Sequence, residues 1–217
     1  GTALLVTAAV GSGIAAQRLS DDGGVQLLAN AVVTGAALAA LITMLAPISG
    51  AHFNPAVTLT ARFNRTISTR EASAYVMTQV AGGIGGVALA NIMFELPALH
   101  LATTERSSAA LWVSEAVATV ALLLLIGSLS RHPTPNAPFV IGAWIAGAFW
   151  FTSSTSFANP AVTTARMFSD TYAGIAPTSA GAFVAVQIAA VAIALAADRF
   201  LHPATAIETT ATTGRPS

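Results

Sequence analysis

Six apolar segments divide this chain, near residues 1–17, 26–46, 72–95, 109–130, 138–155 and 179–201. A bilayer core of about 30 Å requires about 20 helical residues, and each segment meets or nearly meets that length. Because backbone polar groups cannot remain unpaired in lipid, such segments have to be helices. A composition of 54% hydrophobic and 8% charged residues agrees with this interpretation. The sequence therefore predicts an all-α membrane protein with six spans.

The charged and sulfur-containing residues exclude several other functions. Nine basic residues balance nine acidic ones, so no net charge attracts nucleic acid, and the absence of cysteine excludes disulfides, thiolate nucleophiles and Cys-based metal sites. The first residues, GTALLVTAAVGSG, lack the charged region and cleavage site of a signal peptide. We interpret them as a first span that is already under way, with a few residues missing ahead of it.

A short polar motif occurs twice, as AHFNPAVTLTAR at 51–62 and as SFANPAVTTARM at 156–167. The copies lie after the second and the fifth span, so the chain divides into halves of three spans, about 1–96 and 108–201. Gln79 and Gln187 follow the two copies at similar distances, which supports the division. Because three is odd, the second half must enter the membrane from the opposite side, as in an inverted-topology repeat. We expect one channel domain over 1–201 and a disordered C-terminal tail over 202–217.

Each copy of the motif contains the start of a helix, Asn54-Pro55 and Asn159-Pro160. Each start opens only about ten helical residues, near 55–64 and 160–169, which is about 15 Å or half a bilayer. Irregular backbone at this depth survives only beside protein or water, so the two half-helices should meet at the midplane around a wet path. Their N-termini carry partial positive charge, and the Asn amides can orient a passing water. We therefore expect neutral solutes to pass while cations and protons do not.

On these residues the chain resembles the aquaporin, or major intrinsic protein, family. SGAHFNPAVTL at 49–59 and FANPAVT at 157–163 are similar to its two signature loops, and the similarity covers 1–201. The resemblance implies six tilted transmembrane helices plus two re-entrant half-helices, a homotetramer with one pore per subunit, no cofactor and no metal. It also implies passive conduction of water and small neutral solutes across a lipid bilayer. The pore motif would consist of Asn54, Pro55, Ala56, Asn159, Pro160 and Ala161.

The resemblance further implies a selectivity filter at Thr34, Gly147, Ser156 and Val162. Most family members carry Arg directly after the second Asn-Pro-Ala, whereas this chain has Val162 there and Arg166 one helical turn later. Short, uncharged side chains favour a filter wider than a water-only pore, open to polyols, urea or neutral metalloid hydroxides such as arsenous acid. The chain is similar to bacterial members that lack the filter Arg, and a link to arsenite detoxification rests on analogy alone.

Three further residues have more than one interpretation. Glu115 is an ionisable group at membrane depth, for which a proton relay is one reading, while the family resemblance implies that it supports a re-entrant loop. His52 is a candidate gate or metal ligand, but no second ligand lies at a suitable spacing, which favours a structural hydrogen bond that supports the loop. Arg166 is either an attractor in the outer vestibule or an interfacial anchor, and the sequence favours neither.

The distribution of arginines predicts the orientation in the membrane. Arg62, Arg65, Arg70, Arg131 and Arg199 flank one face, and Arg18, Arg106 and Arg166 flank the other among acidic residues. Loops rich in Arg remain in the cytoplasm, so we expect both termini on the cytoplasmic side of a cell membrane.

Two other classes of function remain in view. A coupled secondary transporter also uses inverted repeats and broken helices, but it needs a titratable group facing the solute. Glu115 is the single candidate carboxylate away from the ends of the spans. An intramembrane hydrolase needs a nucleophile with a His partner, and only His52 approaches a motif.

Overall fold

The computed structural model describes residues 1–203, and this part of the chain forms eight helices and no strand. The helices are α1 (Thr2–Leu19), α2 (Gly23–Ser49), α3 (Pro55–Phe63), α4 (Thr69–Met93), α5 (Ala109–Arg131), α6 (Ala137–Phe151), α7 (Pro160–Arg166) and α8 (Pro177–Leu201). The expected disordered tail, 202–217, lies outside the described residues except for its first two positions.

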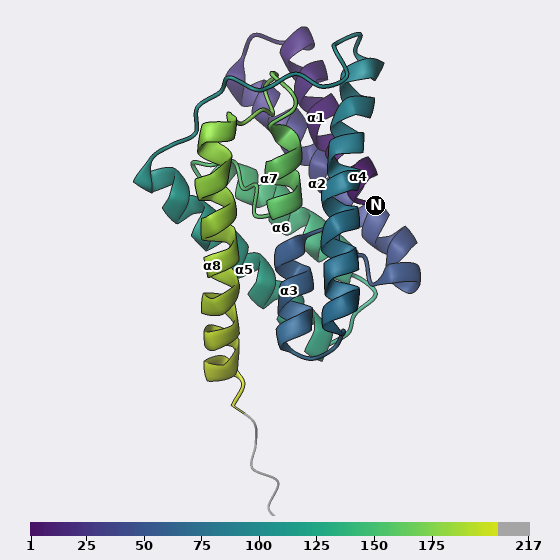
Figure 1. The fold of residues 1–217 in the computed structure, drawn as a ribbon, viewed down its shortest axis with the longest axis vertical. Helices are drawn as coiled ribbons and strands as arrows, with labels where there is room; N and C mark the ends of the chain where they lie inside the picture. Colours follow the sequence, from purple (N-terminus) through teal and green to yellow (C-terminus); the bar gives the residue numbers. More distant parts are fainter. Residues whose placement is uncertain (204–217) are drawn as a thin grey trace, which may run out of the picture.

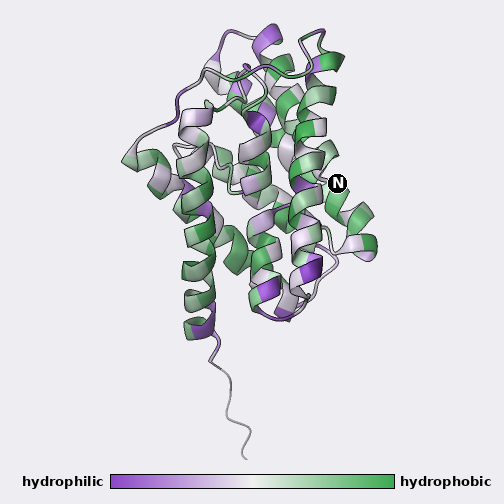
Figure 2. Cartoon of the chain, in the orientation of Figure 1, coloured by the Kyte–Doolittle hydropathy of each residue, from purple (hydrophilic) through white to green (hydrophobic). Residues whose placement is uncertain are grey.

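The six predicted spans correspond to α1, α2, α4, α5, α6 and α8. Among the described residues, five of these helices are long and apolar enough to cross a membrane, whereas α6 has only 15 residues. It ends at Phe151, four residues before the predicted boundary, because Thr152 leaves the helical conformation and Thr155 closes a turn onto the carbonyl of Thr152. Figure 2 shows hydrophobic helix surfaces between hydrophilic ends, the pattern that a bilayer requires.

The two halves of the chain pack in equivalent ways. Helix α1 packs against α4 in the first half, and α5 packs against α8 in the second. Between the halves, α2 packs against α6, and the short helices α3 and α7 touch. In Figure 1, α3 occupies the lower part of the bundle and α7 the upper part. These pairings are the ones that an inverted repeat produces.

The crossing of α2 and α6 depends on two glycines that face each other. A Cβ atom on Gly35 would lie 2.6 Å from the carbonyl oxygen of Gly142, and a Cβ atom on Gly142 would clash with the carbonyl oxygen of Gly35. Small residues of this kind allow helix backbones to approach closely in a membrane. This close crossing brings one face of α2 and one face of α6 to the cavity described next.

Candidate functional site

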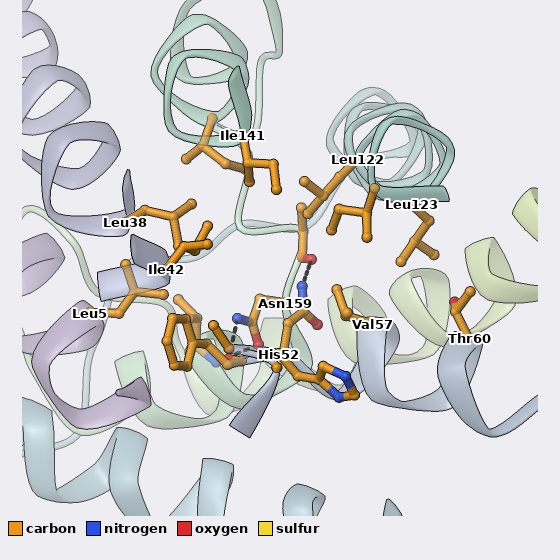
Figure 3. A pocket seen from close by; sticks show the side chains of 18 of the residues that line it. Leu5, Leu38, Ile42, His52, Val57, Thr60, Leu122, Leu123, Ile141 and Asn159 are labelled. Atoms are coloured by element: carbon orange, nitrogen blue, oxygen red, sulfur yellow. Dashed lines mark hydrogen bonds between the residues drawn. The ribbon is translucent and has the colours of Figure 1, made fainter. Parts of the chain in front are cut away.

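A cavity of about 410 Å³ extends between the two halves, from Arg131 at the end of α5 to Arg166 at the end of α7. Its volume lies in the range of cavities that accept small molecules. Aliphatic side chains line one side, and they include Leu38, Ile42, Leu122, Leu123 and Ile141. Asn159 and His52 face them from the other side (Figure 3). The cavity therefore presents an apolar wall opposite a polar one.

Asn54 and Asn159 begin the two half-helices and also join them. Each side-chain oxygen caps its own helix: Asn54 accepts from the backbone N–H of Ala56, and Asn159 accepts from that of Ala161. Each amide nitrogen donates to the opposite loop. Asn54 donates to the carbonyl of Ala158 at 2.8 Å, and Asn159 donates to the carbonyl of Phe53 at 3.0 Å. Since an amide carries two N–H groups, each Asn keeps a second donor, and both residues line the cavity.

The other motif residues lie behind this pair. Pro55 and Pro160 occupy the first helical positions, where a missing N–H costs nothing. They and the alanines that follow them, Ala56 and Ala161, are buried and do not line the cavity. Helix α3 has nine residues, close to the expected length, and α7 has seven, three fewer than expected.

The loops before the two Asn residues adopt the same unusual backbone conformation. Ala51 and Phe53 have positive φ angles, and so do Ser156 and Ala158, the residues three and one before Asn159. Left-handed conformations of non-glycine residues cost of order 1 kcal/mol each and persist only where their surroundings impose them. The reciprocal Asn bonds provide part of that constraint.

Glu115 provides a further constraint on the second loop. Its fully buried carboxylate accepts from the backbone N–H groups of Phe157 at 2.9 Å and Ala158 at 2.8 Å, and from the side-chain amide of Gln187 at 2.6 Å. Hydrogen bonds to a charged acceptor are stronger than neutral ones. Glu115 does not line the cavity, so the geometry corresponds to loop support and provides no contact through which a proton relay could reach a solute.

A matching pair of hydrogen bonds holds each half-helix against its neighbour. Gln79 donates to the hydroxyl of Thr58, and Gln187 donates to the hydroxyl of Thr163, both at 2.9 Å. Both threonines follow their Asn by one helical turn. The Thr58 hydroxyl also lies 3.1 Å from Nδ1 of His52. In the Nε2–H tautomer of His52, Nδ1 accepts the proton of the Thr58 hydroxyl, and the Nε2–H group is a donor without a partner among the described residues. His52 thus makes the expected structural hydrogen bond and also lines the cavity.

Three of the four expected filter residues line the same cavity. Thr34, Ser156 and Val162 line the cavity, whereas Gly147 is exposed on the opposite face of α6 and does not reach it. The cavity face of α6 carries Ile141, Ile145 and Phe149, spaced by one helical turn. Counting back from Asn159 places Gly147 on the wrong face because α6 ends early and an irregular loop follows. The sequence reasoning missed Phe149, although the i, i+4 spacing of the large apolar residues was a usable signal.

Arg166 lies inside the protein. It is 3% exposed, its Nε donates to the carbonyl of Ala173, and its guanidinium carbon lies 3.6 Å from the centroid of the Phe157 ring. It also lines the cavity. This position does not match an interfacial anchor, which would extend toward lipid headgroups.

The segment between α4 and α5 is hydrogen-bonded to the loop that follows the C-terminal end of α7. Asp170 accepts from the backbone N–H of Thr103 at 2.8 Å and from its hydroxyl at 2.9 Å, and these bonds lower the pKa of the Asp170 carboxyl. Ala102 donates to the carbonyl of Met167, and Ala176 donates to that of Thr104.

Within residues 1–203, no group of three His, Cys, Asp or Glu side chains is placed to hold a metal ion.

Comparison with known proteins gives consistent matches. The sequence profile of the family described as Major intrinsic protein matches residues 1–149. Aquaglyceroporin AqpS of Rhizobium meliloti is 46% identical over 201 residues, which cover 93% of this chain and 86% of that protein. Aquaporin A of Dictyostelium discoideum is 30% identical over 74% of this chain and 62% of its own length. The propanediol uptake facilitator PduF of Citrobacter freundii is 27% identical over 53% of each chain.

Proposed function

The chain belongs to the major intrinsic protein family, whose members are passive channels and not enzymes, and we propose that its pore passes solutes larger than water. The candidates are polyols such as glycerol, urea, and neutral metalloid hydroxides such as arsenous acid. The family conducts water and small neutral solutes. The proposal concerns the width of this pore and which of these solutes it admits.

The observation that carries the proposal is that Thr34, Ser156 and Val162, the short uncharged residues expected to form the filter ring, all line the cavity. None of these side chains is long enough to close the cavity. The hydroxyl oxygens of Thr34 and Ser156 have no hydrogen-bond partner among the described residues, which is unusual for buried polar atoms. A rotation about χ1 would allow each to bond a passing hydroxyl or amide group. Phe149 lines the cavity in place of Gly147, and Arg166 lines it one helical turn from Val162, so the passage is narrower than short side chains alone would make it.

The two walls of the cavity suit a solute with one apolar and one polar side. The aliphatic residues of α2, α5 and α6 can pack against the CH face of a polyol, while the second amide N–H groups of Asn54 and Asn159 and the imidazole of His52 face its oxygens. The names of two relatives, an aquaglyceroporin and a propanediol uptake facilitator, agree with solutes of this kind.

A coupled secondary transporter is less well supported. Such a protein needs a titratable group in contact with the solute, and the carboxylate of Glu115 is occupied by three donors behind the loop. Flux through the purified protein should therefore follow the solute gradient and remain independent of any imposed ion gradient.

We also infer a homotetramer in a cell membrane, with both termini on the cytoplasmic side. The support is the family resemblance for the assembly and the arginine distribution for the orientation. Light scattering of the detergent-solubilised protein would test the assembly. A monomer that remains active in liposomes would count against the tetramer.

Stopped-flow shrinkage and reswelling of proteoliposomes in glycerol, urea and arsenous acid would test the solute range. The unaltered protein should admit at least one of these solutes, and Val162→Arg should reduce its entry because the longer side chain crosses the ring. Exclusion of all three solutes by a protein that conducts water would contradict the proposal. So would a Val162→Arg variant with unchanged solute permeability.

A further inference from the structure

We propose that Arg166 is the charged selectivity element of this pore and acts at the level of the ring where Val162 supplies no charge. The inference rests on the proposed function, because it treats the cavity as the conducting pore. It assigns the exclusion of cations, and part of the hydrogen bonding to solutes, to a residue one helical turn away from the position occupied by Val162.

The position of Arg166 on α7 (Pro160–Arg166) directs its side chain back toward the ring. Arg166 follows Val162 by four residues, so both lie on the same face of the helix, and both line the cavity. Side chains on an α-helix lean toward its N-terminus and cover the preceding turn. A long side chain at 166 therefore extends over the turn that carries Val162.

Contacts with the preceding loop fix the level that the guanidinium reaches. Its carbon atom lies 3.6 Å from the centroid of Phe157, the residue next to Ser156 in the ring. Phe157 is itself fixed, because its backbone N–H donates to Glu115 and its ring packs edge-on against Phe183 with centroids 5.4 Å apart. The Nε of Arg166 donates to the carbonyl of Ala173. An arginine that stacks on an aromatic side chain and donates to a carbonyl has a defined orientation.

The terminal nitrogens of Arg166 remain available to solutes. Within the described part of the chain, the Arg166 side chain donates through Nε alone, and the two terminal nitrogens make no hydrogen bond. A nitrogen atom without a partner is either fully buried or in contact with open space, and these two are not fully buried. They are therefore accessible from the cavity that Arg166 lines. Their N–H groups can donate to the oxygen of water, glycerol or urea.

The short side chain of Val162 is a condition for this arrangement. An Arg at 162 would place a second positive charge one turn from Arg166 on the same face, where like charges repel. Valine leaves the space over that turn to the guanidinium and adds no charge. Arg106 lies over the same Phe157 side chain at 5.3 Å but does not line the cavity, so Arg166 is the cation that faces solutes at this level and disfavours the entry of cations.

The decisive experiment compares Arg166→Gln with Arg18→Gln in proteoliposomes. Arg18 also lies over an aromatic ring, that of Phe94 at 5.3 Å, and donates to a backbone carbonyl, but it does not line the main cavity. We expect Arg166→Gln to conduct water while its uptake of methylammonium rises about tenfold or more, because a unit charge a few ångströms from the path is removed. Arg18→Gln should match the unaltered protein. Unchanged methylammonium uptake in a water-conducting Arg166→Gln variant would overturn the proposal.

A second variant decides the question if Arg166→Gln does not fold. Arg166→Lys retains the buried charge but loses the planar group that stacks on Phe157, so we expect cations to remain excluded while the ratio of glycerol to water permeability changes at least about threefold. An unchanged ratio would overturn the proposal. Methylammonium is larger than water, so proton uptake is measured beside it, since protons cross a water-filled path whatever its width. Proton uptake should also rise in Arg166→Gln, and no rise in a pore that passes water alone would overturn the proposal. An unaltered protein that passes water alone would therefore contradict the wide-pore proposal and leave the test of Arg166 intact.

Discussion

The side-chain amide of Asn54 donates to the carbonyl of Ala158 at 2.8 Å, across the junction between the two halves of the chain. The reciprocal bond runs from Asn159 to the carbonyl of Phe53. Each Asn therefore caps its own half-helix and holds the loop that precedes the other one. A residue at either position needs an acceptor on one side and a donor on the other, which is the chemistry of a carboxamide.

The variants Asn54→Asp and Asn159→Asp test this dual role. Each substitution would retain the cap but lose the N–H donor, leave a loop carbonyl without its partner, and add a negative charge beside the cavity. We expect each variant to lose about 1–3 kcal/mol of stability and to conduct less water or to admit cations. Stopped-flow water flux and ion conductance measure the outcome, with Asn136→Asp at an exposed position as the control. Normal water flux and normal ion conductance in both variants would refute the assignment.

Glu115→Gln should act on the second loop and not on proton coupling. Glutamine cannot accept as strongly from Phe157 and Ala158, and its NH₂ group opposes the amide of Gln187. We expect a loss of about 1.5–3 kcal/mol of stability, the range for hydrogen bonds to charged groups, together with lower water flux. Thermal unfolding in detergent measures the first effect. Glu95→Gln, at an exposed position just after α4, is the matched control. Equal melting temperatures for the two variants would contradict the role in loop support.

Local signals in the sequence predicted much of this site. The Asn-Pro pairs marked two helix starts, their repetition marked two equivalent halves, and Gln79 and Gln187 do make equivalent bonds to Thr58 and Thr163. These features depend on short segments whose physical chemistry is readable residue by residue.

The cavity face of α6 was not predictable in the same way. Its sequence from Ala137 to Phe151 is almost entirely apolar, so no polar stripe distinguishes the face toward the cavity from the face toward lipid. Gly147 was assigned by counting through a loop whose turn at Thr152–Thr155 changes the register. The contacts of Arg166 likewise depend on where Phe157 and Ala173 meet it, which is a property of the tertiary fold.

The helix crossing provides a test with a control in the same helix. Gly142→Ala places a Cβ atom against the carbonyl of Gly35, whereas a Cβ atom on Gly147 meets nothing within 4 Å. We expect Gly142→Ala to lower stability by about 1–3 kcal/mol, as overpacking does, and to reduce the yield of folded protein. Gly147→Ala should fold and conduct like the unaltered protein. Altered solute selectivity in Gly147→Ala would return that residue to the filter and contradict its exposed position.

Phe149 provides the complementary test of the ring. It lines the cavity from α6 and is 4% exposed, so shortening its side chain widens the cavity that Thr34, Ser156 and Val162 also line. Phe149→Leu keeps an apolar residue at the position and limits the loss of packing. We expect the ratio of glycerol to water permeability to rise at least about twofold, because the pore radius and the lining groups govern which solutes enter. Phe151→Leu is the control, since Phe151 is exposed at the end of the same helix and does not line the cavity. A ratio that changes equally in both variants, or in neither, would show that Phe149 does not limit the passage of solutes.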